Sequence, residues 1–321
     1  MCDIWKREGS SELRVSDLER HRDSLRKLSV RWVVLSGGEP LLHSDLHGLC
    51  SFFRGEKVRV TLLTTGLLLA KKSVEISELF DDVIVSLDGP APVHDEIRRV
   101  KGGFRLIKDG IAAVRQKRPG LPMTARTTVQ KANYRHLRDT VVIAKAIGLD
   151  SISFLAADLT SEAFNRSVPW PTERQSEVML DELEVKRLEE EIERLIVECA
   201  ADIRTGYIVA NAEKLRKIVT HYRAHLGLAR FQSPPCNAPW VSAVVETDGS
   251  VRPCFFHPAF GNINNSSLEG VLNGEAALEF RKSLDVGSNP VCQKCVCSLN
   301  YNEGKNRSLT TSSASSGRRP R

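Results

Sequence analysis

Short apolar runs alternate with helix-like segments along the first half of this chain, and this alternation most constrains its fold. Five runs rich in Val, Ile, Leu and Thr are predicted strands, at residues 31–36, 58–64, 82–87, 123–129 and 151–155. Between them, apolar residues recur at helical spacing, at 44–53, 104–116 and 134–147. Strands separated by helices pair in parallel through right-handed crossovers, so the predicted fold class is α/β, as a barrel or an open sheet.

The character of the chain changes after residue 156. Two further helices rich in Glu, Leu and Arg, at 175–200 and 212–226, are predicted to form a helical connector. From Phe231 onward Pro, Asn, Gly and Cys replace long periodic runs, which is typical of a small module held together by a metal or a cluster. The predicted organisation is a core at 1–158, a connector at 159–230 that completes it, a Cys-rich module at 231–300 and a tail at 301–321.

The net charge of +6 lies almost wholly in the tail, so it argues little for a nucleic-acid partner. Residues 305–321 hold five Lys or Arg and no acid, which leaves 41 basic against 40 acidic residues in 1–304. The tail is rich in Ser and Thr and has no apolar periodicity, so it is predicted to be disordered.

Nothing in the sequence predicts membrane insertion or secretion. No apolar run approaches the ~18 residues of a membrane helix, and the N-terminus is charged from Asp3 onward. A cytoplasmic location without membrane contact is therefore expected. Because thiols stay reduced there, the eight cysteines point to metal binding or catalysis before disulfides.

The C-terminal cysteines form the strongest chemical signal. A C-x12-G-x4-C spacing joins Cys236 to Cys254, and the stretch between them has the pattern of a hairpin with an Asp-Gly turn, which brings both thiols to one end. Cys292 and Cys295 supply a C-x2-C pair, and Cys297 follows. Four such thiolates suit tetrahedral zinc or a [4Fe–4S] cluster, and the spacing leaves both open. Four unrelated buried thiols are the simpler alternative.

Two turns that follow predicted strands carry candidate ligand contacts. Gly37 and Gly38 allow a ligand to approach the backbone, and Glu39 is suited to pair with an amino group. Asp88 follows another strand, at the end where α/β folds commonly bind ligands, and suits ribose hydroxyls. Each pattern is also compatible with an ordinary turn.

The order of these motifs resembles that of the radical S-adenosylmethionine (SAM) enzymes with a SPASM-type C-terminal extension. The resemblance spans residues 1 to about 300 and rests on Met1-Cys2-Asp3-Ile4-Trp5, Gly37-Gly38-Glu39-Pro40, Ser86-Leu87-Asp88-Gly89-Pro90 with His94-Asp95, and the C-x12-G-x4-C module. It implies a partial (β/α) barrel of the radical SAM type, here without its first strand, and a small Cys-rich C-terminal module.

The resemblance also implies cofactors, partners and a reaction. Family members reductively cleave SAM at a [4Fe–4S] cluster, and the resulting 5′-deoxyadenosyl radical abstracts hydrogen from a substrate. One auxiliary [4Fe–4S] cluster is expected besides the SAM-binding one. The implied partners are a small-molecule or peptide substrate, such as a peptide or natural-product precursor, and a reducing protein such as flavodoxin or ferredoxin.

By the same resemblance, SAM contacts are implied at three strand-end turns. Its methionyl amino group is expected at Gly37, Gly38 and Glu39, its nucleoside at Thr65, and its carboxylate and ribose at Ser86 and Asp88. The implied iron ligands are Cys2, Cys236, Cys254, Cys292 and Cys295, with Cys297 as the alternative to Cys295. No catalytic side chain is identified, and Cys50 and Cys199 are predicted to pack as small hydrophobes.

Cys2 matches the third cysteine of the family motif C-x3-C-x2-C, and the positions of the first two fall before Met1. One thiolate does not hold a site-differentiated cluster, so the chain as printed is not expected to cleave SAM. The favoured interpretation is a sequence that starts within the motif. A degenerate, non-catalytic member of the family and a plain thiol at Cys2 are the alternatives. The rival from another class is a zinc-stapled binding or scaffold protein with an inert barrel.

Overall fold

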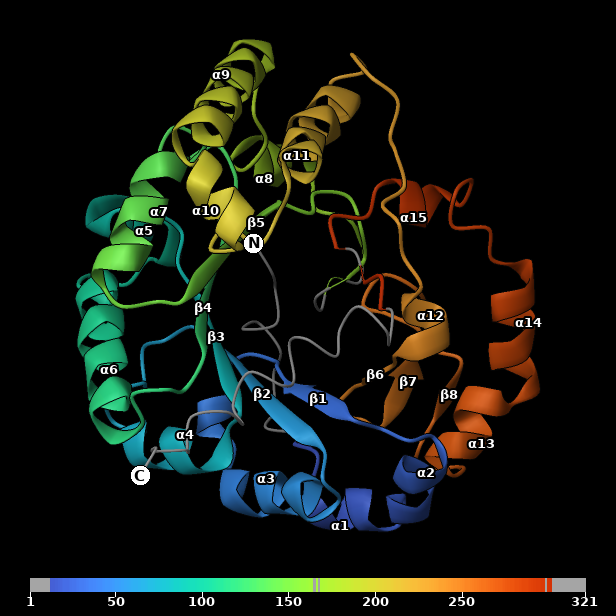
Figure 1. Ribbon diagram of the computed structural model, residues 1–321. Coiled ribbons are helices and arrows are strands. Elements are labelled where there is room, and N and C mark those ends of the chain that lie inside the picture. The colour runs from blue at the N-terminus through green and yellow to red at the C-terminus, as the bar shows by residue number, and fades with distance from the viewer. Residues whose placement is uncertain (1–11, 164–165, 167, 298, 302–321) are drawn as a thin grey trace, which may run out of the picture.

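A computed structural model of the protein describes residues 12–163, 166, 168–297 and 299–301 (Figure 1). Five strands form one sheet in the order β1-β2-β3-β4-β5, and every neighbouring pair is parallel. Each predicted strand is present within one residue of its expected bounds, so the α/β class is confirmed. The strands are β1 (Trp32–Leu35), β2 (Arg59–Thr64), β3 (Asp82–Ser86), β4 (Met123–Val129) and β5 (Ser151–Ala156).

Helices cover the outer face of the sheet, and the inner face turns toward the middle of the molecule, opposite the C-terminal module (Figure 1). The covered face buries Val83, Ala125 and Ile152 completely. The covering helices are α3 (Leu46–Gly55), α4 (Ser73–Leu79), α5 (Ala91–Arg98), α6 (Gly103–Lys117) and α7 (Leu137–Ala146). Two short helices, α1 (Val15–Glu19) and α2 (Arg22–Lys27), precede β1, and the 3-10 turn η2 (Pro40–Leu42) follows it.

Side-chain hydrogen bonds in the loops explain where the bounds of the predicted helices differ from the observed ones. Helix α7 begins three residues later than expected, because the side-chain amide of Asn133 binds the loop before it. The Asn133 Oδ1 atom accepts a hydrogen bond from the backbone of Gln130 at 2.8 Å, and its Nδ2 donates to the carbonyl of Thr128 at 3.0 Å. The short helices α4 and α5 were not predicted, since α5 follows a Gly-Pro turn whose composition favours a loop.

The connector contains α8 (Thr172–Ser176), α9 (Glu182–Glu198), α10 (Ala200–Thr205) and α11 (Ala212–His225). The expectation of one helix over 175–200 is wrong, because a capping box starts a new helix at Asp181. Its carboxylate accepts from the backbone of Glu184 at 2.8 Å, and the Glu184 carboxylate accepts from the backbone of Asp181 at 2.9 Å.

The C-terminal module is a small three-stranded sheet with flanking helices. The predicted hairpin is present as β6 (Val244–Val245) and β7 (Ser250–Arg252), and Gly249 adopts φ +84° in its turn. Strand β8 (Gly261–Asn262) adds to β7. The remaining elements are α12 (Ala238–Val241), α13 (Leu268–Asn273), α14 (Glu275–Ser283) and α15 (Pro290–Gln293).

The module docks on the first helices of the core. Lys27 of α2 pairs with Glu269 of α13 at 3.0 Å, and the backbone of Leu268 donates to His21 Nδ1 at 3.2 Å. The domain boundaries expected from the sequence stay a prediction, and the tail at 301–321 lies outside the described residues except for Tyr301. No helix in the described part of the chain has the length and apolarity needed to cross a membrane.

Candidate functional site

The predicted cofactor contacts gather at the carboxyl ends of neighbouring strands. Gly37, Gly38 and Glu39 follow β1, Thr65 follows β2, and Ser86 is the last residue of β3. Because parallel strands end at the same edge of a sheet, the topology brings these turns to one side of the molecule. Crevices at this edge are where open and barrel-shaped α/β folds bind ligands.

At this edge, the side chain of Glu39 is held in place by several hydrogen bonds. Its carboxylate accepts hydrogen bonds from the hydroxyl of Thr64 at 2.9 Å, and from the hydroxyl and backbone amide of Thr65 at 2.5 and 3.0 Å. It also accepts from the backbone of Leu41 at 3.2 Å and so caps the turn η2. Sequence reasoning placed Thr65 near a nucleoside and did not recognise that it holds Glu39.

Two glycines near this group have different roles, Gly37 in the turn of Glu39 and Gly66 in the turn of Thr65. Gly37 has φ +140° and an added Cβ would meet nothing within 4 Å, so its backbone is open to a ligand. Gly66 has φ +87°, and an added Cβ would lie 2.8 Å from Ile107 and 2.9 Å from Val85. Gly66 therefore allows the turn after β2 to pack tightly against the core, which keeps Thr65 in place.

Asp88 lies in the predicted turn, but its side chain is 0% exposed. Its carboxylate pairs with Arg98 of α5 at 2.6 Å, and its backbone amide donates to the buried ring of His94 at 3.2 Å. Burial lowers the pKa of His94, which keeps its ring neutral as an acceptor. Asp88 thus stabilises the β3–α5 turn, and a ribose hydroxyl has no exposed surface of its carboxylate to reach.

A second candidate site is the pocket of the C-terminal module. Four thiols line it, those of Cys236, Cys254, Cys292 and Cys295, together with apolar walls that include Phe256 and Val291. The hairpin and the short helix α15 bring the two pairs together from segments about 40 residues apart. The Nε2 atom of His257 lies 3.3 Å from Cys292 Sγ, as a neighbour of the pocket.

The pocket is unfavourable for charged thiolates without a counter-charge. Burial raises the pKa of Cys254, Cys292 and Cys295, that of Cys292 to about 11, and the nearby thiols reinforce the effect. Metal or cluster ions are the counter-charge that such thiol groups usually receive. The four sulfurs and apolar walls therefore fit an iron–sulfur or metal centre by the chemistry of the donors.

The remaining cysteines have other surroundings. Cys295 Sγ donates to the backbone carbonyl of Cys297 at 2.8 Å, and Cys297 itself is exposed. Cys50 is buried in α3, where burial raises its pKa to about 12, and Cys199 is half-buried at the end of α9. Both agree with packing roles. Cys2 lies outside the described residues.

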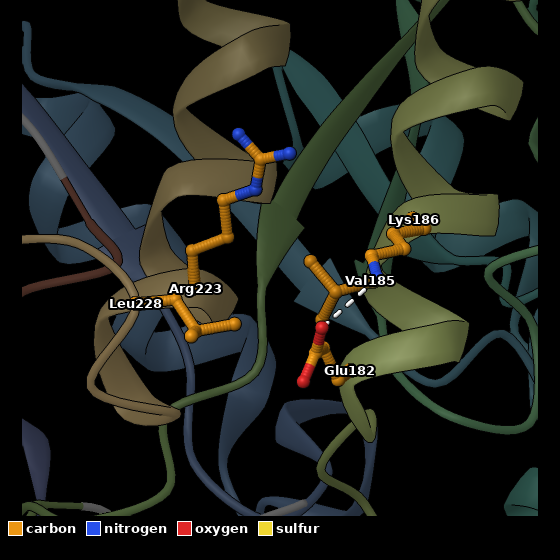
Figure 2. Close-up of a pocket in the computed structure, with 5 residues that line it drawn as sticks. All are labelled: Glu182, Val185, Lys186, Arg223 and Leu228. Atoms are coloured by element: carbon orange, nitrogen blue, oxygen red, sulfur yellow. Dashed lines mark hydrogen bonds and ion pairs between the residues drawn. The ribbon is translucent and has the colours of Figure 1, made fainter.

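A shallow hollow also lies between α9 and α11 (Figure 2). Glu182, Val185 and Lys186 of α9 line it from one side, and Arg223 and Leu228 from the other. Its charges are already paired, because Lys186 binds Glu182 at 2.9 Å and Arg223 binds Glu189 at 2.6 Å. This hollow lies on the helical connector, and no predicted ligand contact lines it.

The fold is a parallel α/β domain with candidate ligand contacts at its strand ends and a thiol-lined module attached. Residues 1–142 match the model of the radical SAM superfamily, and residues 236–296 match that of SPASM, an iron–sulfur cluster-binding domain. The chain therefore contains a radical SAM domain followed by a SPASM domain.

Named relatives agree with these domains, and solved structures share the fold. The chain is 30% identical over 142 residues to an AdoMet-dependent heme synthase of Methanosarcina barkeri, which covers 43% of this chain and 40% of that protein. It is 25% identical to an Fe-coproporphyrin III synthase of the same organism, over 92% of this chain and 76% of the relative. The structure of SuiB of Streptococcus suis with its precursor peptide SuiA matches 93% of this chain and 68% of SuiB, with 16% identity and a TM-score of 0.60. The chain spans about two fifths of the length of the heme synthases that it matches.

Proposed function

We propose that the protein takes part in reductive cleavage of SAM and uses the resulting radical to abstract hydrogen from a peptide or another natural-product precursor. When bound, SAM and its iron–sulfur cluster supply a 5′-deoxyadenosyl radical, and the protein supplies binding, orientation and shielding. The observation that carries the proposal is the Glu39 carboxylate, held by Thr64 and Thr65 at the strand ends of a radical SAM domain.

Glu39 is proposed to bind the amino group of SAM. Four hydrogen bonds fix the direction of its carboxylate, so it meets an ammonium without first losing side-chain freedom. The exposed backbone of Gly37 and Gly38 lies beside it and allows the methionyl group to approach closely. Ser86, half-buried at the end of β3, is proposed near the SAM carboxylate, whereas Asp88 holds the turn.

The four pocket thiols are proposed as ligands of one auxiliary [4Fe–4S] cluster. A zinc ion needs its four sulfurs about 2.3 Å from one centre, whereas a cluster takes one thiolate at each of several irons and so spreads them. The match of residues 236–296 to an iron–sulfur cluster-binding domain supports a cluster over zinc, and Cys295 is proposed over Cys297 because Cys295 lines the pocket.

The names of the similar proteins suggest two substrate classes. SuiB is named with a precursor peptide and other relatives are named as heme or Fe-coproporphyrin III synthases, so peptides and tetrapyrroles are the two classes to screen first. A reducing partner such as flavodoxin or ferredoxin remains a prediction from the resemblance. A cytoplasmic location remains a prediction from the lack of membrane and secretion signals in the sequence.

Anaerobic reconstitution with iron and sulfide tests the auxiliary site on the chain as printed. We expect a brown protein with about four irons per chain, and Cys292→Ala and Cys295→Ala to lower that number. Cys199→Ala, a thiol on the connector, is the matched control and should keep the iron. A colourless protein that holds one zinc would support the zinc-stapled alternative instead.

A second experiment tests SAM cleavage. Because the family motif needs three thiolates and Cys2 matches the third, the printed chain is compared with one extended upstream in the genomic frame. The proposal expects 5′-deoxyadenosine on reduction of the extended protein with SAM, and about eight irons per chain. An extended protein that carries three motif cysteines and both clusters, yet releases no 5′-deoxyadenosine, would contradict it.

A further inference from the structure

A buried histidine joins the core to the C-terminal module. His21 is the residue before α2, is 4% exposed, and lies where α13 of the module contacts α2. Its Nδ1 atom accepts a hydrogen bond from the backbone amide of Leu268, the first residue of α13, at 3.2 Å. The first amides of a helix have no acceptor within the helix, so His21 satisfies a donor that the interface would otherwise bury without a partner.

This hydrogen bond requires a neutral ring. A neutral imidazole carries a proton on one nitrogen and a lone pair on the other, whereas an imidazolium carries protons on both. Because Nδ1 accepts from Leu268, the proton of the neutral ring lies on Nε2, which is buried and has no hydrogen-bond partner among the described residues. A second proton on His21 would set two N–H groups against each other at Leu268, with no acceptor between them.

The surroundings of His21 oppose a positive charge. Burial and the nearby Arg20 lower its pKa, and the weaker effects of the Ile263 carbonyl and the Asp17 carboxylate act in the opposite direction. Arg20 also crosses the interface, where its Nη2 atom donates to Asn264 Oδ1 at 2.8 Å. Strand β8 carries no charged residue. The other charged residues of α1, α2 and α13 are engaged in ion pairs: Glu19 with Arg22, Arg22 with Glu56, Arg26 with Asp23 and Glu56, and Lys27 with Glu269.

We propose that His21 is a pH-sensitive contact between the two parts of the chain: its neutral ring holds α13 on the core, and its protonation releases α13. This inference goes beyond the proposed reaction, since it involves neither SAM nor a cluster. The sign follows from linkage. Release exposes the ring and returns its pKa toward about 6.5, so the released state binds more protons, and acid favours release below that pH.

Release at His21 would loosen a segment that carries one of the pocket thiols. Helix α13 follows β8, and β8 pairs with β7 along Ser250 and Val251. Strand β7 ends two residues before Cys254, which lines the thiol-rich pocket. A short, continuous path through the small sheet therefore connects α13 to the pocket. The neutral ring of His21 contributes to fixing where that pocket lies relative to the core.

Hydrogen–deuterium exchange of the whole chain between pH 7.5 and 5.5 measures the release. After correction for intrinsic exchange rates, the amides of residues 263–272, and that of Leu268 above all, should lose protection by up to about tenfold per pH unit below pH 6.5. The amides of β4 are the internal reference and should keep their protection. This window lies above the range in which carboxyl groups usually titrate. It also lies above the pKa of the buried His225, which is about 4.

Two variants separate the proton from the hydrogen bond. His21→Gln offers an amide oxygen that accepts from Leu268 and binds no proton, so its protection at 263–272 should be close to that of the wild type at pH 7.5 and should not fall in acid. His21→Leu removes the acceptor and should lower the protection of the Leu268 amide about tenfold or more at both pH values. His47→Gln, at an exposed position of α3, is the matched control and should keep the wild-type pH dependence.

Three results would overturn the proposal. The first is protection at 263–272 that does not fall in the wild type between pH 7.5 and 5.5. The second is an equally steep fall in the wild type and in His21→Gln. The third is a long-range ¹H–¹⁵N spectrum of the wild type at pH 7.5 that places the proton of His21 on Nδ1. Because the first and third are measured on the wild type, they decide the question even where a variant does not fold.

Discussion

The hydroxyl of Thr65 donates to the carboxylate of Glu39 at 2.5 Å, and this bond joins the end of β2 to the turn that follows β1. Two turns that are 26 residues apart in sequence are thereby held as one unit. A charge-assisted hydrogen bond of this kind contributes more than a neutral one, because the acceptor is ionised. Glu39 is consequently oriented before any ligand arrives.

Thr65→Val should weaken the binding of S-adenosylhomocysteine by about tenfold, because Glu39 loses one hydroxyl donor while the backbone amide of residue 65 remains. Isothermal titration calorimetry measures this. Binding of 5′-methylthioadenosine, which lacks the amino group, should change little. Thr205→Val, at an exposed position of α10, is the matched control; equal losses for both nucleosides would show that Thr65 acts on the nucleoside instead.

Arg98→Met should destabilise the fold by about 3–5 kcal/mol, since it leaves the carboxylate of Asp88 buried without its partner. Thermal unfolding of the protein without cofactors measures the change. The double variant Asp88→Asn with Arg98→Met should recover part of the loss, because no buried charge remains. Arg194→Met removes an exposed pair with Glu190 and should cost less than about 1 kcal/mol; a similar cost for both single variants would refute the structural role of Asp88.

His257→Phe should make the reduction potential of the auxiliary cluster more negative and keep its iron. The ring lies 3.3 Å from Cys292 Sγ and packs against Phe280. Hydrogen bonds to cluster sulfurs are among the factors that set the reduction potential. The reduced cluster carries more negative charge than the oxidised one, so the loss of a hydrogen bond disfavours reduction. Redox titration followed by electron paramagnetic resonance measures it, with the exposed His47→Phe as control. An unchanged reduction potential would show that His257 does not influence the cluster.

Stability should fall as the pH falls from about 6.5 to about 4, in part because of His225. Burial lowers the pKa of His225 to about 4, while the unfolded chain titrates near 6.5. Between these values the unfolded state binds more protons, so acid favours unfolding, by up to about 3 kcal/mol for one such group. The sign is therefore a loss of stability on acidification.

His225→Phe should flatten this acid dependence. The Nε2 atom of His225 is buried without a hydrogen-bond partner among the described residues, and its ring packs against Phe231, so phenylalanine should be tolerated at pH 7. Melting temperatures of both proteins between pH 4.5 and 7.5 provide the comparison. If the melting temperature of His225→Phe fell with pH as steeply as that of the wild type, other groups would cause the loss of stability in acid.

The strands of the sheet could be predicted from the sequence, because strands of a parallel sheet are buried and so appear as continuous apolar and β-branched runs. The run at 123–129 became β4 without a shift of either bound. Helix boundaries were harder, because single side chains decide them: Asp181 starts α9 inside a segment whose periodicity suggested one longer helix. Cys236 and Cys254 were expected at one end of a hairpin, and they line the same pocket.

The sequence by itself determined the α/β class, the order of the motifs and the residues of the thiol-rich module, since these depend on local periodicity and spacing. Only the tertiary structure decided which groups meet. It turned Asp88 toward Arg98 and Thr65 toward Glu39. The physical reason is that the charge balance of a side chain depends on neighbours from other strands, which no local pattern of one strand encodes.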